Sequence, residues 1–108
     1  MKELKDTVVA MESDNYKHRF IAEYWQTKIR YNKLCDFIRK IEIADLLGEE
    51  PPKHDCPLSL LQDQKYYMDE LLEIYEKRAI IEKIDLNVGI GEVNTTLNGI
   101  GEVNTTLN

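Results

Sequence analysis

The chain has 108 residues and a formal net charge of −6, with 31% charged and 43% hydrophobic residues. This length has room for one domain, and the composition is typical of a folded helical protein. The net negative charge argues against sequence-independent binding to long DNA or RNA, which needs a surplus of Lys and Arg. No apolar run approaches the roughly 18–20 residues of a membrane span, and the start lacks the apolar core of a signal peptide. We therefore expect a cytoplasmic protein.

The first elements along the chain are predicted to be helical. The segment LKDTVVAME fits either a short helix packed against the rest of the chain or a single strand, and we favour the helix. No Pro or Gly then occurs from Asp14 to Leu47, where side chains of one stripe recur at spacings of three and four. These are Phe20, Tyr24, Thr27, Tyr31, Leu34, Ile38 and Ile41. Ser13, Asp14 or Asn15 can supply the N-cap, and Gly48 can end the helix. A helix over about residues 14–47 would be about 50 Å long.

The stretch GEEPPKHDCP interrupts the helical pattern, because two adjacent prolines cannot continue a helix. It predicts a loop over residues 48–56, with Pro57 at the start of a second helix that runs to about residue 84. The stripe of this second helix is Leu60, Gln64, Tyr67, Leu71, Ile74, Arg78 and Ile81. Two long helices joined by a loop of about ten residues are expected to form an antiparallel hairpin.

Two polar residues, Gln64 and Arg78, interrupt the apolar stripe of the second helix. A buried amide or guanidinium without partners costs several kcal/mol, so both must be satisfied. They can pair with Thr27 or Glu23 of the first helix or with a neighbouring subunit. They can also be ligand contacts in a groove between helices or protomers. Both interpretations remain open at this point.

Several further apolar residues lie beside the two stripes, and one hairpin has no room to cover them all. They are Trp25, Ile29, Phe37, Tyr66 and Leu72. Exposed apolar area of this extent usually marks a partner, and a second copy of the chain is the simplest partner. The predicted fold is therefore all-α: a long antiparallel helical hairpin over residues 1–86 that assembles into an oligomeric bundle.

The last twenty residues consist of the decapeptide GIGEVNTTLN written twice. Asn98-Gly99 between two β-prone runs is a strong hairpin signal, because both residues tolerate positive φ. The abundance of Gly, Asn and Thr fits a disordered segment equally well. Either way, the duplicated tail at 87–108 is predicted to be an appendage, because identity without drift indicates a duplicated or added sequence.

The sequence holds no catalytic or metal-binding pattern. Cys35, Cys56, His18 and His54 lack the two tight pairs of a zinc module, and a disulfide is not expected in a reducing compartment. The carboxylates of the second helix are spaced as a solvated acidic face. No nucleotide-binding glycine loop is present. We therefore predict no enzymatic activity, no cofactor and no metal.

The best binding candidate is the stretch TKIRYNK in the first helix, where Arg30, Tyr31 and Lys33 lie close together. Cations beside an aromatic ring can hold a phosphate while the ring stacks on a base. The second helix adds the polar and aromatic stripe residues Gln64, Tyr67 and Arg78 as further predicted contacts. The competing interpretation is a solvent-exposed face of paired charges.

The two helices resemble a family of short phage-encoded proteins first labelled from crAss-like phages. The first helix carries its K-L-x-x-F-I element as Lys33-Leu34-Cys35-Asp36-Phe37-Ile38. The second helix carries its pattern as Leu60, Leu61, Gln64, Met68, Leu71, Leu72, Ile74 and Arg78. The resemblance covers about residues 15–86 and implies a phage or prophage origin. The architecture is also broadly similar to helical phage sponge proteins, which assemble as oligomers and sequester cyclic nucleotide signals.

These observations lead to two functional hypotheses. The first is a non-enzymatic phage accessory protein in the host cytoplasm, which self-associates and binds a small anionic immune signal such as a cyclic nucleotide. The second is a protein-interaction adaptor or inhibitor that docks an apolar helix face on a host or phage protein.

Overall fold

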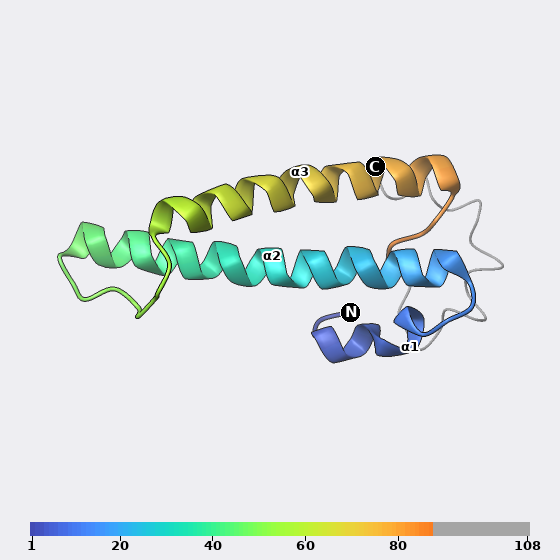
Figure 1. The fold of residues 1–108 in the computed structure, drawn as a ribbon, viewed down its shortest axis with the longest axis horizontal. Coiled ribbons are helices and arrows are strands. Elements are labelled where there is room, and N and C mark those ends of the chain that lie inside the picture. The colour runs from blue at the N-terminus through green and yellow to red at the C-terminus, as the bar shows by residue number, and fades with distance from the viewer. Residues whose placement is uncertain (88–108) are drawn as a thin grey trace.

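The computed structural model describes residues 1–87, which form four helical elements: η1 (Leu4–Thr7), α1 (Val8–Met11), α2 (Tyr16–Leu47) and α3 (Leu58–Glu82). No strand occurs among these residues, so the all-α class is confirmed for the described part of the chain. The long helices α2 and α3 lie side by side and run in opposite directions, and η1 and α1 lie against α2 (Figure 1). The duplicated decapeptide, with both of its predicted conformations, lies outside the described residues.

The ends of α2 and α3 follow from local capping. The Asn15 side chain accepts a 2.9 Å hydrogen bond from the backbone N–H of Lys17 at the start of α2. Gly48 ends α2 in the left-handed region at φ 70, which glycine adopts without a Cβ penalty. Lys83 takes the same conformation after α3, at φ 59. That turn directs residues 84–86 back toward α2.

The core lies between α2 and α3, at the end of the pair where α3 finishes. Its buried residues are Phe20, Ile21 and Tyr24 from α2, Leu72, Tyr75 and Ala79 from α3, and Ile84 and Leu86 beyond α3. Phe20 and Tyr75 meet edge to face, with ring centroids 5.6 Å apart. A smaller contact of Ala10 with Ala22 fixes α1 on the other side of α2. One layer of aromatic and aliphatic side chains therefore holds the long helices together.

The face of α3 that packs on α2 is not the stripe expected from the sequence. We call the expected set, Leu60, Gln64, Tyr67, Leu71, Ile74, Arg78 and Ile81, the outer stripe, because every member is exposed. The inner stripe lies one residue later along the helix and consists of Leu61, Lys65, Met68, Leu72, Tyr75, Ala79 and Glu82. Its members are buried or half-buried. Ala79 is fully buried in this face, so a larger side chain there would overpack the contact with α2.

Four of the five apolar residues expected to need a partner are at least half-buried within one chain, whereas Tyr66 is 59% exposed, as expected. Ile29 is buried, and the Trp25 indole donates a 2.5 Å hydrogen bond to the carbonyl of Leu86. Phe37 is half-buried and lies edge to face with the His54 ring of the loop. The remaining exposed apolar side chains lie on α1, at both ends of α2 and along α3.

Candidate functional site

The structure distributes the six predicted contact residues over separate surfaces. Arg30 lines a hollow formed by η1, α1 and α2, which we call the N-terminal hollow. Tyr31 lines the interhelix cleft between α2 and α3. Lys33 is exposed on α2. Gln64, Tyr67 and Arg78 lie on the outer stripe, and at ~1.5 Å per residue Gln64 and Arg78 are about 20 Å apart along the helix. Within one chain, these six residues do not form a single site.

The N-terminal hollow has a volume of about 360 Å³, within the range of small-molecule pockets. The described residues that line it are Leu4, Lys5, Thr7, Val8, Met11, Gln26 and Arg30. This set contains two cations, two uncharged hydrogen-bonding side chains and three apolar side chains, and no carboxylate. Lys5 also forms a 3.2 Å ion pair with Glu3 outside the lining, and both side chains are exposed. Such a pair is weak in water, so Lys5 can turn to another anion.

Hydrogen bonds hold the wall of this hollow in place. The buried Thr7 hydroxyl donates to the Leu4 carbonyl at 2.7 Å and accepts from the Gln26 amide at 2.9 Å. The same amide lies 3.4 Å from the Met11 sulfur. One α2 side chain therefore ties η1 and α1 to the long helix.

The Asp6 carboxylate fixes the start of η1. It accepts the backbone N–H groups of Glu3 and Lys2 at 3.0 and 3.1 Å. These two hydrogen bonds lower the pKa of Asp6, because they favour the ionised carboxylate. The short N-terminal helix is therefore positioned by local bonds as well as by Gln26.

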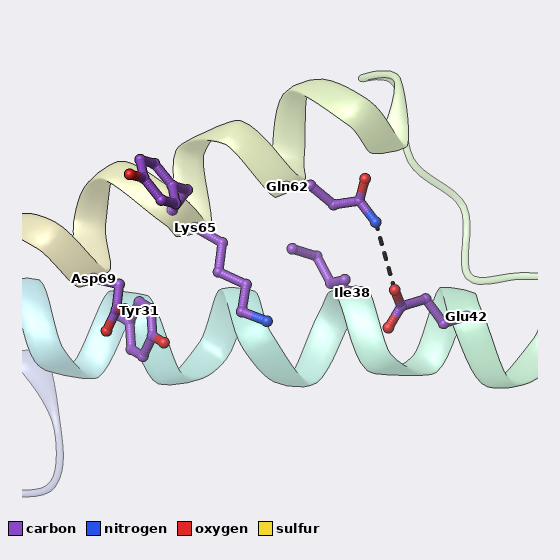
Figure 2. Close-up of a pocket in the computed structure, with 7 residues that line it drawn as sticks. Tyr31, Ile38, Glu42, Gln62, Lys65 and Asp69 are labelled. Carbon is purple, nitrogen blue, oxygen red and sulfur yellow. Dashed lines mark hydrogen bonds between the residues drawn. The ribbon is translucent and has the colours of Figure 1, made fainter.

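The interhelix cleft has a volume of about 250 Å³ (Figure 2). Tyr31 and Asp69 lie at one end of it, and Glu42 accepts a long 3.5 Å hydrogen bond from Gln62 at the other, with Lys65 between them. Two carboxylates beside one cation repel an anion. This cleft is therefore a poor site for a phosphate-bearing ligand.

Tyr31 also makes contacts that bear on its predicted role. The Lys28 ammonium lies 5.7 Å from the centroid of the Tyr31 ring. A hydrogen bond with Cys35 is the main cause, and partial burial the second, that raises the pKa of Tyr31 to about 12. The ring is half-buried against the core cluster and already has a cation beside it, which limits its contact with a ligand.

Arg78 is paired within its own helix rather than with Glu23 or Thr27, the partners considered from the sequence. Its Nε and Nη2 atoms donate to the Glu82 carboxylate at 2.7 and 3.3 Å, and its guanidinium lies 4.7 Å from the Phe20 ring centroid. These bonds raise the pKa of Arg78 and lower the pKa of Glu82. Because a guanidinium has five N–H donors, Arg78 can still bind a second acceptor.

The reactive side chains form no recognisable centre. Cys35 and Cys56 are half-buried free thiols, and no group of three or more His, Cys, Asp or Glu residues within 1–87 could hold a metal ion. His54 is half-buried, with its Nδ1 2.7 Å from the Cys56 carbonyl. Within the same residues, no helix has the length and apolarity to cross a membrane.

Sequence reasoning found Arg30 but missed Lys5, Thr7 and Gln26 as its neighbours. Nothing in the local sequence links Gln26 to Thr7, since their contact depends on how η1 folds back on α2. The mixed composition of LKDTVVAME, with one cation just before an apolar run, is the only sequence signal for this surface.

The described fold is that of a small all-α protein built on two long helices, with a cationic hollow where η1 and α1 lie against α2. A family model described as Sequestin matches residues 14–81, which span α2, the loop and nearly all of α3. Because this match covers more than half of the chain, the protein belongs to the Sequestin family. No curated protein and no solved structure matches the chain. Arg30 lies inside the matched segment, whereas Lys5 and Thr7 precede it.

Proposed function

We propose that this protein is a non-enzymatic phage accessory protein that sequesters a small anionic immune signal of the host, such as a cyclic nucleotide. It acts in the host cytoplasm as a self-associated form and thereby counters antiviral defence. The observation that carries the proposal is the N-terminal hollow, whose described lining combines Lys5 and Arg30 with apolar side chains and no carboxylate. The family name is compatible with a sequestering role.

The hollow offers complementary groups for a nucleotide. The Arg30 guanidinium suits two oxygens of a phosphate, and Lys5 adds a mobile point charge. Leu4, Val8 and Met11 provide apolar contact for a base or sugar face, and a methionine adapts readily to ligand shape. Sequestration needs binding alone, so neither a nucleophile nor an acid–base pair is required. The affinity is expected to fall with added salt, because the cations are exposed.

Thermal unfolding and calorimetry against a panel of cyclic nucleotides test this function. A ligand bound only by the folded state, present at about 100 times its Kd, stabilises that state by about 2.7 kcal/mol and raises Tm. We expect Arg30→Gln to abolish the rise in Tm while the free protein keeps its own Tm.

Arg39→Gln is the matched control, because Arg39 is an exposed arginine of the same helix that pairs with Asp36 at 3.5 Å. It should bind as the wild type does. If no nucleotide in the panel raises Tm, or if Arg39→Gln loses binding as fully as Arg30→Gln does, the proposed ligand site is wrong.

A second candidate function is an adaptor or inhibitor that docks an apolar helix face on another protein. It is favoured by the exposed end of α2, where Leu46 is 84% and Leu47 65% exposed. Affinity capture from host lysate with the wild type and with Leu46→Glu tests it. A host protein retained by the wild type and lost with Leu46→Glu supports this function, and identical captures contradict it.

A further inference from the structure

The outer stripe of α3 has the spacing of a coiled-coil seam. Its positions, Leu60, Gln64, Tyr67, Leu71, Ile74, Arg78 and Ile81, alternate steps of four and three residues over about three heptads. The apolar members are exposed, with Tyr67 at 69% and Ile81 at 78%, because α2 covers the inner stripe instead. A helix face with this period fits another helix of the same period. The stripe is about 30 Å long.

We infer that two copies of this chain pair along their outer stripes in antiparallel orientation, with Leu71 opposite Ile74 of the second copy. This inference deepens the self-association on which part of the proposed function rests. The two-fold axis then passes between Leu71 and Ile74, so the most apolar part of the stripe meets itself at the centre. Exposed aliphatic side chains on both copies are removed from water together, which is the main driving force for association.

Arg78 selects the antiparallel orientation. In a parallel pair, Arg78 would lie opposite Arg78 of the second copy, and two guanidinium groups would repel each other in a partly dehydrated seam. In the antiparallel pair, Arg78 lies opposite Tyr67 of the second copy. A tyrosine ring and hydroxyl suit a guanidinium, both as a cation–π partner and as a hydrogen-bond acceptor. The helix dipoles also favour antiparallel neighbours.

Charges at the edge of the stripe agree with this register. Glu70 and Lys77 flank the stripe on its solvent side, and the antiparallel register brings Glu70 of each copy beside Lys77 of the other. Gln64 then lies opposite Ile81, near the ends of the seam. At the ends of the seam the Gln64 amide stays in contact with water, so it is not buried without a partner. Gln64, Tyr67 and Arg78 therefore serve assembly.

Sedimentation velocity on the full chain tests the pairing. At tens of micromolar we expect a species of twice the 12.7 kDa chain mass for the wild type. Ile74→Glu places a charge at the centre of the seam, so this variant should sediment as a single chain while its circular dichroism stays helical.

Ile43→Glu is the matched control, since Ile43 on α2 is 47% exposed and Ile74 is 52% exposed. It should remain paired. A wild type that sediments at 12.7 kDa overturns the inference, and so does a control that dissociates as completely as Ile74→Glu.

Disulfide trapping tests the orientation. Cys35 and Cys56 are first replaced by Ser, and Gln64→Cys and Ile81→Cys are then introduced separately and together. The antiparallel register places residue 64 opposite residue 81 of the second copy, so only the double variant should form a covalent dimer on oxidation. Dimers from either single variant indicate parallel pairing and overturn the proposed orientation.

Ligand binding is measured separately, so the two proposals can fail independently. If the protein pairs but binds no nucleotide, the pairing is supported and the proposed ligand is wrong. If the protein binds a nucleotide through Arg30 but sediments as a single chain, the ligand site is supported and the pairing is wrong.

Discussion

The two stripes of α3 have the same spacing and differ by one residue in register, yet one is buried and the other exposed. On the inner stripe, Leu72, Tyr75 and Ala79 are buried. On the outer stripe, Leu71 and Ile74 are exposed. The number of apolar side chains does not distinguish the stripes, because each has five apolar and two polar members. Side-chain shape and reach therefore decide which face of α3 is covered by α2.

Two tyrosines form hydrogen bonds between α2 and the inner-stripe side of α3. Tyr24 of α2 donates a 2.8 Å hydrogen bond to Glu76 of α3, and Tyr75 of α3 donates in return to Glu23 of α2. Each ring is buried between α2 and α3, while its hydroxyl reaches a carboxylate at the edge of this contact. These reciprocal bonds fix the register of α2 against α3.

The sharpest test of the comparison truncates neighbouring leucines, one on each stripe. Leu72→Ala leaves a cavity in the core and should lower the free energy of unfolding by about 2–5 kcal/mol. Leu71→Ala, measured in the Ile74→Glu background so that pairing does not contribute, should lower it by less than about 0.5 kcal/mol. Urea unfolding followed by circular dichroism measures both. Equal losses would show that the two stripes are buried alike.

A smaller effect concerns the hydroxyl of Tyr75. Burial and the hydrogen bond to Glu23 raise the pKa of Tyr75 from 10.0 to about 12. The folded state therefore holds this proton more tightly than the unfolded state, and the stabilisation is lost as the pH rises from 10.0 toward 12. Tyr75→Phe should cost about 1–2 kcal/mol at neutral pH.

The measurement is the urea midpoint as a function of alkaline pH. In Tyr75→Phe, the urea midpoint should fall less steeply with rising pH than in the wild type. Tyr66→Phe changes an exposed tyrosine of α3 and should leave this pH dependence as in the wild type. An unchanged decline in Tyr75→Phe would contradict the linkage.

The smallest predicted effect concerns the one ion pair that joins the two stripes, Arg78 with Glu82. Its hydrogen bond lowers the pKa of Glu82 below the ordinary 4.5. The resulting stabilisation is present above that ordinary value and is lost as the pH falls through the lowered pKa. Glu82→Gln should therefore lower Tm slightly at neutral pH. It should also make Tm fall less steeply as the pH is lowered. Glu73→Gln, which removes an exposed pair with Lys77 at 3.3 Å, is the control and should shift Tm less than Glu82→Gln.

Much of the secondary structure could be predicted from the sequence because its causes are local. The helix expected over about 14–47 is observed as Tyr16–Leu47, and the one expected over about 57–84 as Leu58–Glu82. Asn15 caps the first helix and Gly48 ends it, as single residues can. The adjacent prolines separate the two helices. Each of these signals acts through neighbours within one or two turns.

The candidate site could be predicted only in part. Arg30 lies in the hollow that best suits an anion, but its partner Lys5 comes from an element whose position the sequence did not indicate. Lys33, predicted beside Arg30, is exposed about one turn further along α2 and does not line the hollow. Helical spacing tells which residues share a face, and it does not tell which faces of different elements meet.

The helical class of residues 1–87, the ends of the long helices and the outer stripe of α3 could therefore be inferred from the sequence alone. Only the tertiary structure decided which stripe is buried and which residues surround Arg30. The reason is physical: helix formation depends on contacts between near neighbours, whereas packing depends on distant residues fitting in size and hydrogen bonding, as Trp25 does with Leu86 and Gln26 with Thr7.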